Sequence, residues 1–379
     1  LHNRKHSFPT RRSSDLALEV YIAVHGDKHP SVATTKSCIA SVLQDQGQYE
    51  AAAAMFKEAL EVRIAVHGDK HPEVATTKNN LALVLRDQGQ YEAAAAMYKE
   101  ALEVKIAVHG EKHPEVATTK HNLASVLHDQ GQYEAAASMY KEVLEVNIAA
   151  HGEKHPHVAA TKLRIASVLR DQGQYKVADA MYMAALEVFT TVHGDHHLNP
   201  FITRSYQLFT RTLQLQWCQP PSPPASFGDL ATQQSQLLEV AERLLHAEHD
   251  RIGQFLCFHA RTLRLAARLA DAEHAARRAL LIYERNFPRD SIRVAPALFE
   301  LADVLAERQC AEEALQHAQR ALQLRQDHLP AAHADVARSL MQVARLQGGD
   351  EEQGKQHALE MLRGALGDRH PEVQRLSGC

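Results

Sequence analysis

The sequence predicts an all-α protein, a solenoid of helix-turn-helix units that repeat every 42 residues. The period is set by His-Gly pairs, which begin at His25, His67, His109, His151 and His193. A five-residue run, Asp-Gln-Gly-Gln-Tyr, recurs in step and starts at Asp45, Asp87, Asp129 and Asp171. A fixed period of this size is typical of stacked supersecondary units, none of which buries its apolar face alone. Such chains usually act as binding surfaces.

The second repeat shows where its two helices lie. One helical face is marked by residues three and four apart, at Val74, Thr77, Leu81 and Leu85. Pro72 suits the first helical position, where the missing N–H is not needed, and Gly89 ends the helix. A second stripe from Tyr91 to Leu102 predicts another helix, which ends at Gly110. We expect Ala82, Ala94 and Ala101 to let the two backbones approach closely.

This hairpin resembles the tetratricopeptide repeat at Leu81, Ala82, Leu85, Gly89, Tyr91, Ala94, Tyr98 and Ala101. The His-Pro-Glu-Val-Ala run that begins at His71, together with Asn79-Asn80-Leu81-Ala82, looks like the kinesin light chain type of this repeat. The resemblance covers Ala17 to about Val192. It implies a right-handed superhelix whose first helices line a concave groove, and a role in protein binding.

Composition excludes several classes of function. The net charge is −4, with acidic and basic residues interspersed, so we expect neither a nucleic-acid nor a membrane partner. The five cysteines are scattered and show no Cys-x-x-Cys spacing, which favours a reducing, cytoplasmic location and argues against zinc-thiolate sites. We expect no cofactor.

Residues 1–16 do not follow the repeat. By register they should match residues 43–58, yet the match begins only at Ala17. Ser7 to Leu16 resembles the translation of a sequencing-adapter oligonucleotide. We therefore treat residues 1–16 as a non-native segment and expect them to be poorly ordered; a natural basic tail is the alternative. The chain is then expected to be a gene fragment.

The chain is predicted to contain two arrays. Residues 17–218 form the kinesin light chain-like array, whose last repeat is degenerate. The Pro-rich residues 219–228 are interpreted as a linker, because proline cannot continue a helix. Residues 229–379 form a divergent helical array, in which Ala272, Ala276 and Ala279 match Ala314, Ala318 and Ala321 at the same 42-residue period.

Each repeat loop carries a His-x-x-x-His pair, such as His67 and His71. On a helix this spacing would suit zinc. Gly68 lies between the two histidines and no third ligand recurs at a fixed distance, so we expect exposed loop and helix-start histidines and no metal site. No catalytic nucleophile set or phosphate-binding loop is evident. The repeated aspartates are expected to be solvated or loop-anchoring acids.

The first helix of each repeat varies more between repeats than the second. The varying positions share one face of that helix, because they are three and four residues apart. We predict that they form a peptide-binding groove lined by Ser37, Ser41, Gln44, Asn79, Asn80, Leu83, Arg86, His121, Asn122, Ser125, His128, Leu163, Arg164, Ser167 and Arg170. Random drift at exposed positions is the alternative.

The groove predicts its ligand. Asparagine amides can hold a peptide backbone, and Arg86 and Arg170 favour acidic side chains. We therefore expect an acidic, extended protein segment, anchored by an aromatic or aliphatic residue near Leu83 and Leu163. The carboxylate clamp that binds chaperone tails is not expected, because only Asn80 fits its pattern.

The predicted function is that of a non-enzymatic interaction scaffold. The kinesin light chain resemblance implies an adaptor that couples cargo to a motor. The sensor tail of a larger signalling NTPase is the alternative. A metal-binding or enzymatic role of the loop histidines is a more distant one.

Overall fold

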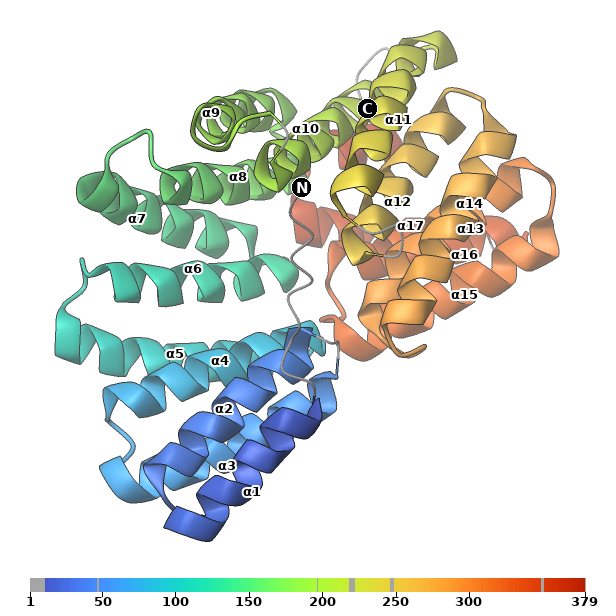
Figure 1. Ribbon diagram of the computed structural model, residues 1–379. Coiled ribbons are helices and arrows are strands. Elements are labelled where there is room, and N and C mark those ends of the chain that lie inside the picture. Colours follow the sequence, from blue (N-terminus) through green and yellow to red (C-terminus); the bar gives the residue numbers. More distant parts are fainter. Residues whose placement is uncertain are drawn as a thin grey trace. The chain divides into compact units, whose positions relative to one another are not determined.

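The computed structural model describes residues 11–45, 48–195, 197–217, 222–245, 249–348 and 351–378, and all regular structure within these ranges is helical. The α-helices of the first half are α1 (Arg11–His25), α2 (Pro30–Asp45), α3 (Tyr49–His67), α4 (Pro72–Asp87), α5 (Tyr91–His109), α6 (Pro114–Asp129), α7 (Tyr133–His151), α8 (Pro156–Asp171) and α9 (Tyr175–His193). The remaining α-helices are α10 (Leu198–Trp217), α11 (Gly228–Leu244), α12 (Asp250–Leu265), α13 (Leu269–Asn286), α14 (Ala295–Glu307), α15 (Ala311–His328), α16 (Ala334–Gln347), α17 (Glu351–Leu366) and α18 (Pro371–Leu376). Two short 3-10 helices, η1 (Pro224–Phe227) and η2 (Ile292–Val294), precede α11 and α14. Consecutive α-helices pair as hairpins (Figure 1), which confirms the predicted all-α fold.

The two helices predicted for the second repeat are confirmed as α4 and α5. His71 has an extended backbone and caps α4, because its side chain accepts the backbone N–H of Glu73. Pro72 follows at the first helical position. Gly110 stops α5 with a φ of 81°, a left-handed conformation that favours glycine. The same pattern of cap, proline and final glycine recurs in the repeat that contains α8 and α9, at His155, Pro156 and Gly194.

Alanines lie where these helices touch. Ala82, Ala94 and Ala101 have no exposed surface, and neither has the ring of Tyr98. The alternation of small and large side chains lets the backbones approach and fills the remaining space. This confirms the predicted contact surface of the hairpin.

The chain forms two compact units, Leu1–Val126 and Leu127–Cys379, called unit 1 and unit 2 below. The boundary falls inside α6 rather than at the Pro-rich residues 219–228. The described part of that Pro-rich segment belongs to unit 2, where η1 contacts α11 and α12 and Phe227 is buried. Burial of Phe227 thus fixes a segment that composition alone suggested to be a linker.

Helix α1 begins within the segment that was expected to be poorly ordered. Residues 1–10 lie outside the described part of the chain, whereas 11–16 are helical. The expectation is therefore wrong for 11–16. Leu16 is 61% exposed and adds nothing to the core, in line with the break in the repeat pattern.

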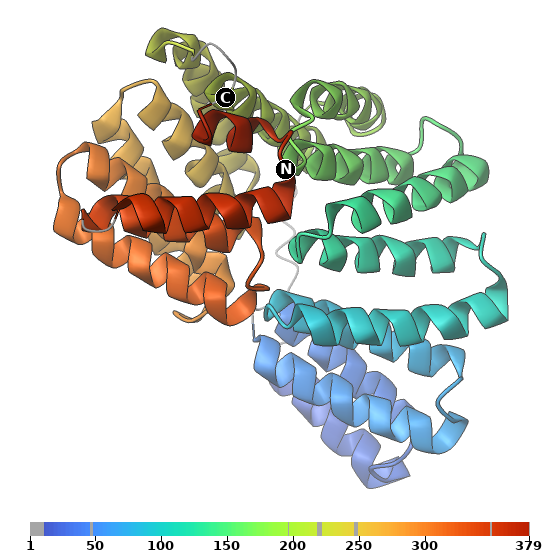
Figure 2. The same cartoon turned by 180° about the vertical axis from the view of Figure 1, so that it is seen from behind.

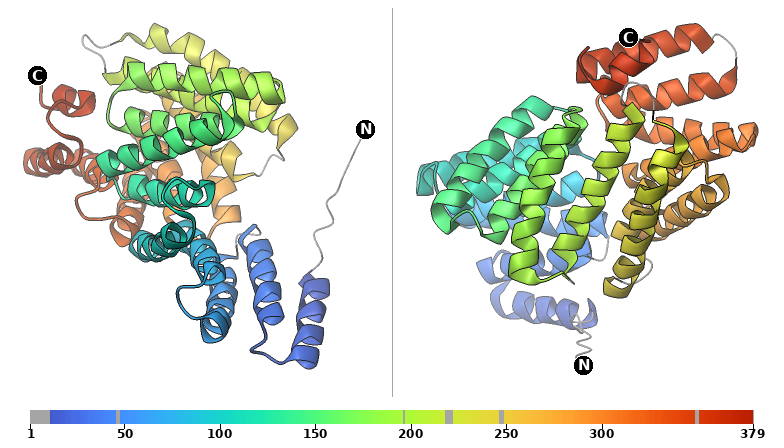
Figure 3. Two further views of the ribbon diagram at one scale, coloured as in Figure 1. Left: turned by 90° about the vertical axis from the view of Figure 1, so that its left-hand side faces the viewer. Right: turned by 90° about the horizontal axis from the view of Figure 1, so that it is seen from above.

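The divergent array keeps the hairpin turn without its glycine. Gly131 and Gly173 adopt a φ of 77° in the turns after α6 and α8. Ala267 and Gln309 take the same role after α12 and α14, with φ of 59° and 64°. Figures 2 and 3 show successive helical hairpins within unit 2. No helix in the described ranges is long and apolar enough to cross a membrane.

Candidate peptide-binding face

In unit 1 the predicted groove residues lie on one face of α2, α4 and α6. The opposite face of α4 forms the core, with Val74 and Leu81 buried. Most groove positions are exposed or half-buried, namely Ser37, Ser41, Gln44, Asn79, Asn80, Leu83, Arg86, His121 and Asn122. Ser125 differs, since only 4% of its surface is exposed. Most of these side chains are therefore at least partly accessible in unit 1, and their role as a binding face stays a prediction.

In unit 2 the same positions are largely covered. Leu163, Ser167 and Arg170 are buried, while His128 and Arg164 are half-buried. The cover over Arg170 comes from α10, the first helix of the degenerate repeat. Its guanidinium carbon lies 5.6 Å from the ring centroid of Tyr206 and 5.7 Å from that of Phe209. Cation–π contacts of this kind hold an arginine against an aromatic wall.

Gln44, Arg86, His128 and Arg170 occupy the same position in successive repeats and form one column of the predicted groove. Two of these side chains make contacts between repeats. The Gln44 side-chain amide donates to Asp87, with a nitrogen–oxygen distance of 2.9 Å. His128 Nε2 lies 2.8 Å from Asp171 Oδ2, in the same register one repeat apart. In these two cases the aspartate of the following repeat therefore contacts the side chain of the repeat before it. The expectation of merely solvated or loop-anchoring aspartates is corrected for these two.

Arg170 ends this ladder, because the next repeat offers no aspartate at the matching position, Leu213. Arg170 instead holds its own neighbour, Asp171, through two hydrogen bonds of 2.8 and 2.9 Å. Burial alone would raise the pKa of the Asp171 carboxyl, but Arg170 and His128 more than reverse this and hold it well below its usual value. The charge of Arg170 is thus already neutralised, which corrects its predicted role in selecting acidic ligands.

Ser41, Leu83, Ser125 and Ser167 form a second column of the predicted groove, and Ser167 packs inside its hairpin. The Ser167 hydroxyl lies 3.0 Å from the Tyr182 hydroxyl, between α8 and α9. Two repeats earlier, Leu83 takes the place of Ser167 and Tyr98 the place of Tyr182. The Tyr98 hydroxyl is buried without a hydrogen-bond partner among the described residues. Variation in this column therefore changes the interior of each hairpin as well as its face.

The second histidine of each loop pair caps the helix that follows it. The sequence predicted histidines at helix starts but did not identify this hydrogen bond. In each case Nδ1 accepts the backbone N–H two residues on, at 3.0 to 3.2 Å, for His29, His71, His113, His155, His197, His249, His333 and His370. The His67 and His71 rings stack with centroids 4.4 Å apart. In five of these eight the signal was a histidine directly before a proline that starts a helix, whereas His197, His249 and His333 precede Leu198, Asp250 and Ala334. In the described part of the chain, no cluster of three or more His, Cys, Asp or Glu residues could hold a metal ion.

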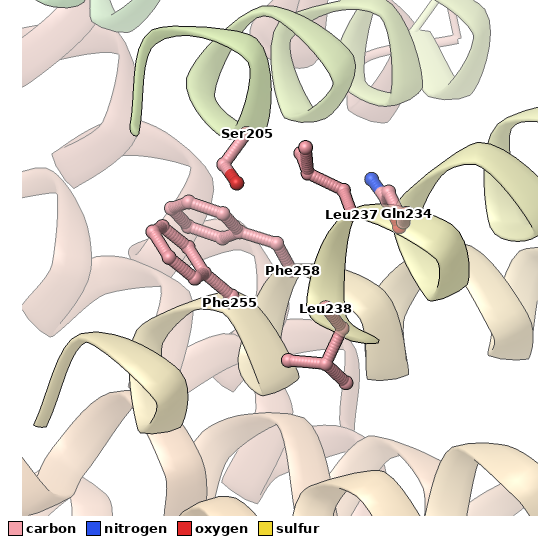
Figure 4. Close-up of a pocket in the computed structure, with 6 residues that line it drawn as sticks. All are labelled: Ser205, Gln234, Leu237, Leu238, Phe255 and Phe258. Carbon is pink, nitrogen blue, oxygen red and sulfur yellow. The ribbon is translucent and has the colours of Figure 1, made fainter. Parts of the chain in front are cut away.

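A small pocket in unit 2 lies between α10, α11 and α12 (Figure 4). It is lined by Ser205, Gln234, Leu237, Leu238, Phe255 and Phe258. The space accommodates about one water molecule, which is too little for a substrate. We interpret it as a packing defect between helices.

Comparison with known proteins bears on the repeats and on the fold. The tetratricopeptide repeat family model matches residues 31–107, 79–149 and 115–191. No curated protein matches the chain significantly. A Rap protein complexed with Competence and Sporulation Factor has a TM-score of 0.64 at 13% identity, covering 91% of this chain and 92% of that one.

Two further structures extend this picture. Aspartyl phosphate phosphatase F from Bacillus subtilis gives a TM-score of 0.58 at 17% identity, covering 83% of this chain and 76% of that one. The structure of the nearly identical TPR-like repeats of a putative kinesin light chain from Podosopora anserina has a TM-score of 0.46 at 15% identity, covering 57% of this chain and 99% of that one. These identities show the fold alone. The repeat sequence, the hairpins and the family match show that residues 31–191 of this chain are tetratricopeptide repeats.

Proposed function

We propose that this protein is a non-enzymatic interaction scaffold, and that the exposed face of α2, α4 and α6 in unit 1 binds an extended peptide segment. The tetratricopeptide repeats of residues 31–191 support a role in protein interaction. The Rap protein of similar fold was solved in complex with a factor, so this type of fold accommodates a bound partner. A cytoplasmic location remains a prediction from the scattered cysteines.

The observation that carries the proposal is where the repeats differ. Between the first and second repeats, half-buried Ser37 becomes Asn79 and exposed Ser41 becomes half-buried Leu83. The second helices keep the same alanines at the contact surface, as at Ala52 and Ala94. Duplicated repeats that keep their packing and change one accessible face fit selection for a ligand on that face.

The chemistry of this face indicates the kind of ligand. Asn80 supplies an amide group that both donates and accepts hydrogen bonds, which suits an extended backbone of any sequence, whereas the Oδ1 atom of Asn79 is buried. Arg86 adds a half-buried guanidinium with five donors, which suits an acidic side chain. An apolar residue of the ligand would pack on Leu83. Arg170 is neutralised by Asp171 and does not contribute to this preference. Arg86 also interacts within the protein, so an acidic side chain of the ligand would compete for its guanidinium.

The test is a peptide-library selection on the intact chain, followed by affinity measurements on variants. Arg86→Glu should weaken an acidic ligand by about tenfold or more, because charge-assisted hydrogen bonds contribute about 1.5–3 kcal/mol. Asn80→Ala should weaken acidic and neutral ligands alike. The matched control is Lys99→Glu, a charge reversal on the exposed surface of α5, which should leave affinity unchanged. Selection of basic peptides, or loss of binding in the control alone, would refute the assignment.

An adaptor that couples cargo to a motor and the sensor tail of a signalling NTPase are two uses of the same surface. No residue of the described face distinguishes them. An enzymatic or metal-binding role has less support, because the second histidine of each loop pair already uses Nδ1 as a helix cap and the described ranges contain no metal-ligand cluster of His, Cys, Asp or Glu.

A further inference from the structure

Two helix starts near the end of unit 2 lie against turns of the earlier repeats. His333, which caps α16, lies against the turn at Gly131, and His370 and Pro371, at the start of α18, lie against the turn at Gly173. A Cβ atom added at Gly173 would lie 2.4 Å from Pro371 Cδ and 2.8 Å from His370 Cδ2. Glycine in these turns therefore leaves the space that the rings occupy.

Polar contacts fix α18 in this position. Glu372 accepts hydrogen bonds from Arg338 of α16, with distances of 2.5 and 3.0 Å. Arg375 donates to the backbone carbonyl of Gln216 at the end of α10, and its guanidinium lies 6.0 Å from the Trp217 ring centroid. Figure 2 shows α18 as a short helix that follows α17. The contact joins segments about 160 to 200 residues apart in sequence and closes unit 2 on itself.

We propose that α18 is an acid-sensitive latch, which His333 and His370 keep closed while their rings are neutral and release when they are protonated. This inference goes beyond the proposed peptide binding and does not depend on it.

Both rings must be neutral in the closed structure. His333 and His370 are 7% and 3% exposed. Nδ1 of His333 accepts the Asp335 N–H at 3.0 Å, and Nδ1 of His370 accepts the Glu372 N–H at 3.2 Å. A protonated ring has no acceptor, so protonation removes the cap and leaves a charge at a helix N-terminus.

The charged groups around the rings do not stabilise the protonated form enough to offset burial. His370 faces Glu372 on its own helix, Asp171 from α8 and Arg338 from α16. His333 faces Asp335 and Arg338 from α16, with Arg325 from α15 and His128 from α6. Burial lowers the pKa of both histidines. Tyr133 of α7 and Tyr175 of α9 also face Arg338, and burial raises their pKa so that they remain neutral.

The sign of the pH effect follows from these directions. In the released state the rings regain their ordinary pKa of about 6.5, above that of the closed state. Closure is therefore complete above this value and weakens as the pH falls below it. Each histidine lowers the closing equilibrium constant by up to about tenfold per pH unit, so the two together reach about a hundredfold.

Trp217 supplies the readout, since it is the chain's single tryptophan and lies beneath Arg375. Quenching of its fluorescence by acrylamide would be measured from about pH 7.5 to about pH 5, with far-UV circular dichroism in parallel. We expect the quenching constant to rise about twofold through this range while helicity is kept. A chain truncated after Leu366 should show the high value at every pH. A flat profile, or a truncated chain that matches the intact one at neutral pH, would overturn the latch.

A double variant tests the histidines themselves. His333→Asn with His370→Asn keeps good helix caps but cannot be protonated, so Trp217 should stay shielded at both ends of the pH range. The matched control is His155→Asn, which makes the same substitution at a cap of the same geometry, 3.2 Å in length, on a less buried ring of another loop. The control should follow the wild-type profile. Any other behaviour of the double variant would overturn the assignment to these rings.

Discussion

Tyr98 and Tyr182 occupy the same position two repeats apart, and we predict that removing their hydroxyls has opposite effects on stability. Both rings are fully buried. The Tyr182 hydroxyl has a partner in Ser167 at 3.0 Å, whereas Leu83 replaces that serine beside Tyr98. The Tyr98 hydroxyl has no partner among the described residues. One hydroxyl therefore contributes to stability, and the other carries an unrecovered cost of burial.

The magnitudes follow from hydrogen-bond energetics. Tyr182→Phe removes a neutral hydrogen bond and should destabilise by about 0.5–1.5 kcal/mol. Ser167 limits the loss, because its hydroxyl still donates to the carbonyl of Leu163 at 3.2 Å. Tyr98→Phe removes an unsatisfied group that costs about 1–3 kcal/mol when buried, so the variant should be more stable by about 1 kcal/mol after relaxation. Phe56, fully buried at this position of the first repeat, shows that the site accepts phenylalanine.

The assay is urea unfolding followed by far-UV circular dichroism, analysed with a nearest-neighbour repeat model because such arrays depart from two-state behaviour. Leu83→Ser, alone and with Tyr98→Phe, completes a double-mutant cycle. Its coupling energy should be about 1 kcal/mol in favour of the serine–tyrosine pair. Equal destabilisation by Tyr98→Phe and Tyr182→Phe, or no coupling in the cycle, would refute the reasoning.

Three further predictions concern the scaffold. Ala94→Leu should destabilise by about 1–3 kcal/mol in urea unfolding, because the larger side chain enters a fully buried helix contact, whereas the exposed Ala96→Leu should change little. Asp171→Asn should cost about 3–5 kcal/mol because it leaves Arg170 buried without its counter-charge; Asp179→Asn, in a more exposed pair, should cost less than about 1 kcal/mol. Because the pKa of Asp171 is lowered in the folded state, its contribution is present above its usual pKa and is lost as the pH falls, so the variant should lose less stability on acidification than wild type. Gln309→Gly should raise the free energy of unfolding by about 1 kcal/mol, because Gln309 has a φ of 64°, a conformation that favours glycine. An unchanged or lower midpoint of urea unfolding would show that the glutamine side chain compensates for this backbone strain.

The fold could be predicted because the same local sequence features recur in each repeat. The proline before Val74, the glycine at 89 and the alanine at 94 mark helix start, turn and contact by their own chemistry. None of these requires knowledge of a distant segment. The compact units were less predictable, because the buried Phe227 secures a segment whose prolines suggested a free linker.

The candidate site was only partly predictable, because exposure on a helix face depends on what the next repeats place over it. Periodicity placed the varying positions of α2, α4 and α6 on one face of each helix, and their role in binding stays a prediction. It could not show that Tyr206 and Phe209 of the degenerate repeat cover Arg170, since neither aromatic belongs to the repeating pattern. It also could not show His370 against Gly173, a contact between segments 197 residues apart.

The fate of one column shows how nearly identical repeats acquire different roles. Gln44 and His128 each engage an aspartate of the following repeat, so the column begins as a structural ladder. At Arg170 the next repeat supplies Leu213 instead, and the arginine turns to Asp171 and to the aromatic wall. At one end of this column Gln44 is uncharged and hydrogen-bonded to Asp87. At the other end Arg170 is charged but buried against aromatic rings. A ligand that contacts Gln44 or His128 must therefore compete with bonds inside the protein, so a larger contribution to peptide affinity is expected from Asn80, which lies outside this column. Loss of affinity in Asn80→Ala that exceeds the loss in Gln44→Ala would support this ranking, and the reverse order would show that the ladder itself is the binding element.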